Sequence, residues 1–66
     1  MKVLIRIPKR QEHVMRGPRT VQSILEELRI NPETVIVIRG QSLLTRDSVV
    51  EDADEIEVRP ALSGGR

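Results

Sequence analysis

A chain of 66 residues, 38% of them hydrophobic and none of them aromatic, is long enough for one small domain with an aliphatic core. The absence of cysteine excludes disulfides, thiolate metal sites and a cysteine nucleophile. No stretch is apolar for long enough to form a signal peptide or a membrane span, so we expect a soluble, cytoplasmic protein.

Charges of opposite sign are segregated along the chain, although the net charge is only +1. Residues 1–20 contain six basic residues and one acidic residue, whereas residues 47–57 contain six acidic residues and no basic one. The acidic segment is either a solvated surface or a site for a basic partner. The basic segment could contact phosphates, but without aromatic side chains for base stacking we expect no direct binding of nucleic acid.

The first third of the sequence predicts a β-hairpin. Residues 2–7 alternate between apolar and polar side chains, which is the period of a half-buried strand, and Pro8 ends the alternation. The polar stretch 9–12 predicts a turn. Residues 13–16 then predict a short second strand that ends at Gly17-Pro18.

A helix is predicted after the hairpin. Thr20 suits the N-cap position, because its hydroxyl can accept a hydrogen bond from a backbone N–H of the first turn. Asn31-Pro32 ends the helix. Its apolar side chains recur at i, i+3, i+4 and i+7, at Val21, Ile24, Leu25 and Leu28.

The second half of the chain predicts a further set of strands. The β-branched run 35–38 is too short for a helix and predicts a strand buried on both faces. After a turn at Arg39-Gly40, Leu43 and Leu44 predict a short edge segment. Residues 48–50 predict a single helical turn, and residues 55–59 predict the last strand, with Ile56 and Val58 pointing inward.

This order of elements predicts an α+β fold of the β-grasp (ubiquitin-like) type, with a mixed four- or five-stranded sheet packed on one helix. The first and last strands would lie parallel at the centre of the sheet, with the helix in a right-handed crossover between strands. We expect residues 1–60 to form the domain and residues 61–66 a flexible C-terminal tail carrying Gly64-Gly65.

A β-grasp order that leads to Gly-Gly resembles the MoaD/ThiS family of ubiquitin-like sulfur carriers. The resemblance spans the whole chain. The Asn-Pro-Glu-Thr-Val stretch and the Arg-Gly turn are most similar to the bacterial carriers for tRNA 2-thiouridine synthesis. The segments that carry the resemblance are 20–28, 31–40, 52–58 and Ser63-Gly64-Gly65.

Two residues depart from the family pattern. Ala53 replaces the glycine that usually lies between the acidic residues, so this turn must avoid a positive φ or tolerate strain. Arg66 follows Gly65, whereas mature carriers of the family end at the second glycine. This implies processing, truncation during expression or loss of the activity.

The resemblance implies that the chain is a substrate rather than an enzyme. An E1-like adenylating enzyme would use ATP to activate Gly65, and a sulfur donor such as a cysteine desulfurase or a rhodanese would convert it to a thiocarboxylate. Gly64, Ser63 and Leu62 would thread the tail into the enzyme, because residues without bulk near the terminus allow a close approach. A downstream sulfur-acceptor enzyme would receive the sulfur. The chain itself would hold no cofactor and no metal.

The family also implies that partners dock on an apolar patch of the sheet beside the tail. Leu4 lies on the polar face of the first strand and is the clearest candidate for exposure, and Arg59 is a second candidate for the partner surface. An isolated exposed leucine is common, so Leu4 can equally have no role. His13 has no second ligand or nucleophile near it in the sequence, and we assign it no role.

Three functions remain open at this stage. The first is a sulfur carrier for tRNA thiolation, thiamine or the molybdenum cofactor. The second is a ubiquitin-like protein modifier conjugated to lysines through Gly65. The third is a non-catalytic interaction module or RNA-binding domain, for which the basic first third of the chain is the argument.

Overall fold

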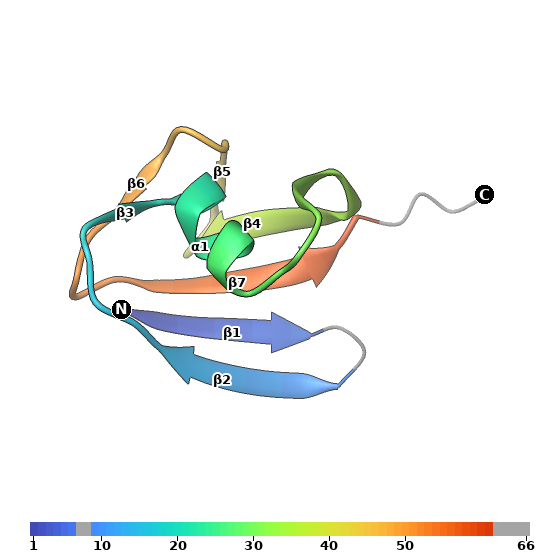
Figure 1. The fold of residues 1–66 in the computed structure, drawn as a ribbon, viewed down its shortest axis with the longest axis horizontal. Coiled ribbons are helices and arrows are strands. Elements are labelled where there is room, and N and C mark those ends of the chain that lie inside the picture. The colour runs from blue at the N-terminus through green and yellow to red at the C-terminus, as the bar shows by residue number, and fades with distance from the viewer. Residues whose placement is uncertain (7–8, 62–66) are drawn as a thin grey trace.

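The computed structural model describes residues 1–6 and 9–61. Among these residues, five strands form one mixed sheet in the order β2-β1-β7-β4-β5, and β3 and β6 form a two-stranded sheet. The α-helix lies across one face of the larger sheet, which gives two layers (Figure 1). This arrangement confirms the predicted architecture. The elements are β1 (Lys2–Arg6), β2 (Arg10–Val14), β3 (Arg19–Thr20), α1 (Val21–Glu27), the 3₁₀ helix η1 (Pro32–Thr34), β4 (Val35–Arg39), β5 (Ser42–Leu44), β6 (Val49–Val50) and β7 (Glu55–Pro60).

Strands β1 and β7 are parallel neighbours in the middle of the sheet, as predicted (Figure 1). In their register Val3 lies beside Ile56 and Ile5 beside Val58, and all four side chains are buried. Because side chains alternate between the faces of a strand, this register directs one aliphatic row of each strand toward α1. The core contains Met1, Val3, Ile5, Val21, Ile24, Leu25, Val35, Val37, Val50, Ile56 and Val58.

Helix α1 begins and ends with hydrogen bonds that satisfy its terminal backbone groups. The hydroxyl of Thr20 accepts from the backbone N–H of Ser23 at 3.1 Å, which confirms Thr20 as the N-cap. At the other end the N–H of Ile30 donates to the carbonyl of Leu25 at 2.9 Å, and that of Arg29 to Glu26 at 3.1 Å. This pair of bonds is a Schellman motif, and it places Arg29 at φ 60°, a conformation that favours glycine.

The second strand begins earlier than predicted. The prediction of a turn at 9–12 and a strand at 13–16 was wrong, because β2 spans Arg10–Val14 and pairs antiparallel with β1. Its residues are mostly exposed. An edge strand beyond the reach of the helix needs no apolar face, and so it carries no alternating pattern in the sequence.

The predicted helical turn at 48–50 was also wrong. Val49 and Val50 form β6, which pairs antiparallel with Thr20 and Arg19 of β3. Val50 is fully buried, whereas Val49 is 48% exposed. Two residues cannot hold an extended conformation alone, so the long-range partner decides between helix and strand here.

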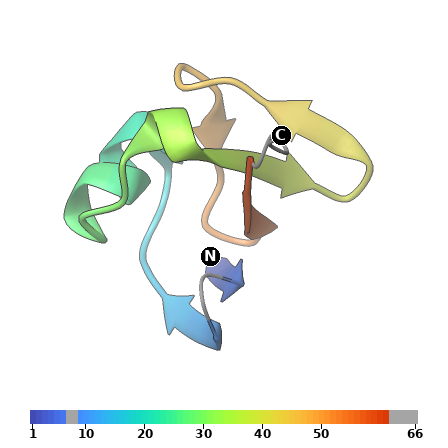
Figure 2. The ribbon, with the colours of Figure 1, turned by 90° about the vertical axis from the view of Figure 1, so that its right-hand side faces the viewer.

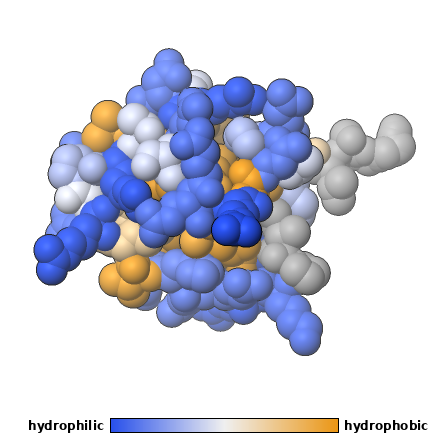
Figure 3. Space-filling model, viewed as in Figure 1, coloured by the Kyte–Doolittle hydropathy of each residue, from blue (hydrophilic) through white to orange (hydrophobic). Residues whose placement is uncertain are grey.

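Strand β4 is buried on one face only, contrary to the prediction for the run 35–38. Val35 and Val37 belong to the core, while Ile36 and Ile38 are half-buried. The reason is the layer structure: α1 and η1 lie on one side of the sheet, and no element of residues 1–6 and 9–61 covers the other side (Figure 2). The surface on the helix side is mostly hydrophilic (Figure 3), so the helix places its polar residues outward.

The chain around Met1 is closely packed. The backbone N–H of Gly17 donates to Oδ1 of Asp52 at 2.9 Å, and the terminal ammonium of Met1 donates to the carbonyl of Met15 at 2.6 Å. A Cβ added at Gly17 would lie 2.8 Å from the Asp52 nitrogen and 2.8 Å from Cε of Met1. Glycine is therefore required at position 17 by this close approach.

Ala53 fits its turn without strain. The turn is closed by a hydrogen bond from the N–H of Asp54 to the carbonyl of Glu51 at 3.0 Å. Among the described residues other than glycine, Arg29 is the one with a positive φ, so Ala53 avoids that region. The departure from the family pattern at Ala53 is accommodated.

Candidate functional site: the outer sheet face and the base of the tail

The face of the larger sheet opposite α1, called the outer face here, carries a row of side chains that crosses all of its strands. Leu4 is the register partner of Glu12 on one side and of Glu57 on the other. Glu57 in turn pairs with Ile38, and Ile38 with Leu43. The row therefore contains two carboxylates and three aliphatic residues, with Glu57 between Leu4 and the adjacent pair Ile38 and Leu43.

Leu4 occupies the middle of this row. The prediction that Leu4 is exposed was wrong, because its side chain is half-buried between its neighbours on β2 and β7. Two other apolar residues of the outer face are strongly exposed: Val14, the register partner of Lys2, at 83%, and Leu43 at 67%. Leu4, Ile38 and Leu43, called the aliphatic band here although Glu57 lies between Leu4 and Ile38, are therefore partly open to a partner.

A shallow hollow of about 270 Å³ opens over Leu4 and Ile38 of this band, which supply its apolar side chains. Gly40 and Ile56 also line it, although the side chain of Ile56 faces α1. Its remaining lining residues are charged, with both signs represented, so it can receive an apolar side chain whose neighbours carry charges. These charged residues are Lys2, Arg10, Glu12, Glu55 and Glu57.

Glu57 holds two arginines on the outer face. Nε of Arg59 donates to its Oε2 at 2.8 Å, and the Nη2 group of Arg59 donates to Oε1 at 3.3 Å. Nε of Arg6 reaches the same Oε2 from β1. The hydrogen bonds from Arg59, together with the charges of Arg59 and Arg6, lower the pKa of Glu57, and the carboxylate raises the pKa of Arg59.

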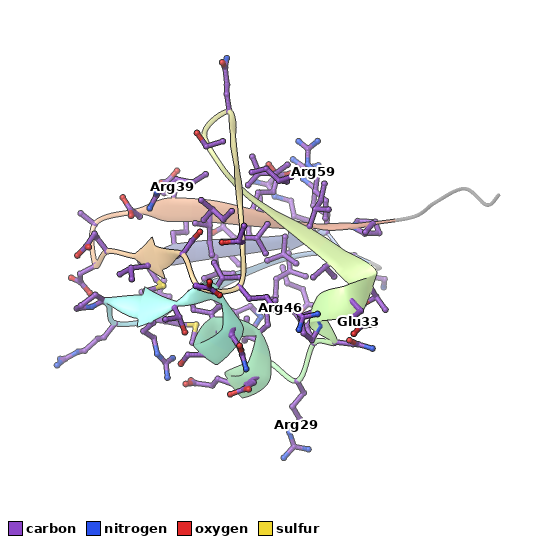
Figure 4. All side chains as sticks on the ribbon, turned by 90° about the horizontal axis from the view of Figure 1, so that it is seen from above. Arg29, Glu33, Arg39, Arg46 and Arg59 are labelled. Atoms are coloured by element: carbon purple, nitrogen blue, oxygen red, sulfur yellow. The ribbon has the colours of Figure 1, made fainter. Side chains whose placement is uncertain are left out.

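A second ion pair lies at the far end of the sheet from the tail. Arg39 donates through Nη1 to Oδ2 of Asp54 at 3.0 Å and to the carbonyl of Val49 at 3.2 Å. The backbone N–H of Glu51 also donates to Asp54, at 2.9 Å. This bond and the Arg39 guanidinium lower the pKa of Asp54. Figure 4 shows Arg59 on the side of the sheet away from α1, and Arg29 projecting beyond the helix.

The base of the tail is fixed to the body of the domain. Strand β7 ends at Pro60, and the N–H of Ala61 donates to the carbonyl of Thr34 at 2.9 Å. The tail residues with assigned roles lie outside the described residues, so those roles and the domain boundary at residue 60 stay predictions. These residues are Leu62, Ser63, Gly64 and Gly65, and Arg66 lies outside as well.

The remaining sequence candidates form no further site. Arg59 is about half exposed on the outer face, where the prediction placed the partner surface. His13 is half-buried, with Nε2 3.4 Å from Oε1 of Gln11. Within residues 1–6 and 9–61 no group of three His, Cys, Asp or Glu side chains is arranged for a metal ion. In the same residues no helix has the length and apolar character needed to cross a bilayer.

Sequence reasoning missed Arg6, Glu57 and Ile38 as parts of this face. Strand alternation places Arg6 on the same face as Leu4, and Glu57 on the same face as Arg59, so the sequence alone could have predicted the face of each residue. What the sequence lacked was the register between β1, β7 and β4, which brings the three side chains together.

Two comparisons with known proteins agree with this fold. The ThiS family model matches residues 2–65, which includes both Gly64 and Gly65. The chain is also 46% identical over 65 residues to the sulfur carrier protein TtuB of Thermus thermophilus, a match that covers 98% of this chain and 100% of the relative. These matches confirm the predicted family and its β-grasp fold.

Proposed function

The chain belongs to the ThiS family, and from this premise we propose that it carries sulfur as a thiocarboxylate on Gly65. The observation that carries the proposal is the full-length similarity to a sulfur carrier together with a family match that extends through Gly64-Gly65. The chain is then the substrate of other enzymes and performs no catalysis itself. Such a carrier can supply sulfur for tRNA, thiamine or the molybdenum cofactor, and the resemblance of segment 31–40 to the bacterial carriers for tRNA 2-thiouridine synthesis favours tRNA thiolation.

The chemistry begins at a carboxylate, which is a poor electrophile. The Gly65 carboxylate attacks the α-phosphorus of ATP, which forms the acyl adenylate and releases pyrophosphate. A persulfide on the sulfur donor then attacks the acyl carbon and displaces AMP, which leaves an acyl disulfide. A second thiol cleaves its S–S bond, so that the thiocarboxylate remains on Gly65 and the two donor sulfurs form a disulfide. These reactions require that Arg66 is first removed, because the attacking carboxylate must belong to Gly65.

The domain contributes recognition to this chemistry. The E1-like adenylating enzyme binds the aliphatic band of Leu4, Ile38 and Leu43 on the outer face, and Arg59 lies between that band and the tail. The hydrogen bond between Ala61 and Thr34 fixes where the tail leaves the domain. Residues 62–65 then thread into the active site of the enzyme, in the cytoplasm, where ATP and the sulfur donor are available.

The test is ATP-dependent activation of a chain that ends at Gly65. With the adenylating enzyme of the source organism and a persulfide donor, intact mass should show one oxygen replaced by sulfur. Gly65→Ala in the same chain should abolish the change and leave the thermal unfolding midpoint unaltered, since Gly65 follows the last strand. Robust adenylation of Gly65→Ala, or no activation of the unsubstituted chain, would refute the proposal. Lysine conjugates on a denaturing gel would instead favour the protein modifier.

A further inference from the structure

An arginine row crosses the outer face at its tail end, one step along the strands from the row of Leu4. Arg6 on β1 is the register partner of Arg10 on β2. On the other side of β1, the parallel register that pairs Ile5 with Val58 makes Arg59 the next neighbour of Arg6. Three guanidinium groups therefore lie on three adjacent strands. Their side chains are about half exposed or more, at 52%, 67% and 51% for Arg6, Arg10 and Arg59.

Like charges on adjacent strands repel one another, so this arrangement needs an explanation. The nearby carboxylates compensate only part of the positive charge. Glu57 forms ion pairs with both Arg6 and Arg59, and Oε2 of Glu12 lies 3.7 Å from Nη2 of Arg10. Three cations are matched by two anions. The excess positive charge is at the end of the face from which the chain leaves for Gly64-Gly65.

The contacts of Glu57 also leave the arginines able to bind more. Arg6 approaches Oε2 of Glu57 through Nε, and Arg59 uses Nε and Nη2. The two Nη groups of Arg6 and Nη1 of Arg59 make no hydrogen bond to any residue within the described part of the chain. The edge of a guanidinium that carries two Nη groups can bind a carboxylate with two parallel hydrogen bonds, as the edge with Nε and Nη2 does in Arg59. Glu57 thus positions both arginines without occupying that edge of Arg6.

We propose that the row of Arg6, Arg10 and Arg59 binds a carboxylate-bearing strip of the adenylating enzyme beside the channel that receives the tail. This inference rests on the proposed function and adds the chemistry of the partner at this position. The same edge of arginine also fits a phosphate. A protein surface is favoured because the row adjoins half-buried Ile36 and the aliphatic band, which an apolar protein surface covers and a phosphate backbone does not.

The row would set the orientation of the carrier as well as its affinity. The other end of the outer face has no such excess of positive charge, because Glu55 is paired with Lys2 and the neighbouring Asp54 is paired with Arg39. An enzyme with carboxylates at the channel mouth attracts the tail end of the face and disfavours the reversed orientation. Only the attracted orientation brings Gly65 to the bound ATP.

The test compares two double variants of equal net charge. Arg6→Gln/Arg59→Gln removes two members of the row, whereas Arg16→Gln/Arg29→Gln removes two exposed cations with no ion pair among the described residues. Adenylation is measured against carrier concentration at low and at high salt, using the adenylating enzyme of the source organism. The row variant should raise KM about tenfold at low salt with kcat unchanged, and the effect should shrink at high salt, because charge steering is screened. The control should stay within about twofold of the unsubstituted carrier.

Arg10→Gln is a second variant for the case that the double variant does not fold. Arg10 lies on the edge strand β2, and its replacement leaves the ion pairs of Glu57 with Arg6 and Arg59 in place. This variant should raise KM by about threefold with the same salt dependence. Equal KM values for the row and control variants would overturn the inference while leaving the proposed function intact, and a fall in kcat alone would overturn it too. No activation of the unsubstituted carrier would refute both. Binding of tRNA that depends on Arg6 and Arg59 would assign the row to phosphate instead.

Discussion

The two faces of the larger sheet share their strands but differ in almost every physical property. The inner face presents Val3, Ile5 and Val58 to α1, and these side chains are 0–5% exposed. The outer face presents leucine, isoleucine and charged residues of both signs, which are half-buried or exposed. The inner face therefore stabilises the fold and the outer face is free to bind partners. Substitutions on the two faces should separate stability from activation.

The largest effect is expected from truncating the core. Leu25→Ala should cost about 2–5 kcal/mol, because Leu25 is 2% exposed and its removal leaves a cavity. A domain of this size is stable by only about 3–10 kcal/mol, so most of the folded population is at risk. Leu43→Ala is the matched control on the outer face and should change stability by less than about 0.5 kcal/mol. Urea unfolding measures both, and equal losses would contradict the separation of the faces.

A smaller loss is expected where the chain packs against the N-terminal residue. Gly17→Ala should destabilise the domain by about 1–3 kcal/mol, because the new Cβ meets the backbone nitrogen of Asp52 and the side chain of Met1. Gly40→Asn is the control: Gly40 has φ +63° with no atom near its Cβ position, and asparagine tolerates that conformation. If Gly17→Ala unfolds at the same urea concentration as the parent, the close approach is not a constraint.

A gain in stability is expected at the end of the helix. Arg29→Gly should stabilise the domain by about 0.5–1 kcal/mol, because glycine adopts a positive φ without the steric penalty that Arg29 pays. Arg29→Ala retains the penalty and should bring no such gain, which separates the backbone effect from the loss of charge. Thermal unfolding of the three proteins is sufficient, and a lower midpoint for Arg29→Gly would contradict the Schellman geometry.

The smallest effect is expected from acid titration of the outer face. The pKa of Glu57 is lowered by Arg59 and Arg6, so its ionised form contributes stability above the pKa of the unfolded chain. That contribution is lost as the pH falls from about 5 through the lowered pKa. Glu57→Gln should therefore be less stable than the parent at neutral pH, and the difference should vanish in acid. Urea unfolding at several pH values checks this, and a difference independent of pH would contradict it.

Local sequence signals determined much of this fold. Alternation located β1 and β7, and the i, i+3, i+4, i+7 pattern with Thr20 located α1 and its N-cap. These elements bury one regular face, and burial is what imposes a period on the sequence. The Gly64-Gly65 dipeptide, read together with this order, also determined the family, which the comparisons confirm.

Only the tertiary structure decided the elements that lack such a period. Strand β2 is an exposed edge, β6 exists because β3 lies beside it, and β4 is covered on one side only. The outer face depends on the same kind of information, because the register between β1 and β7 brings Arg6 to Glu57 and Arg59. Pairing partners and register arise from contacts between residues far apart in the chain. A single sequence therefore determines which face a side chain takes on its own strand, but not which side chains of other strands it meets.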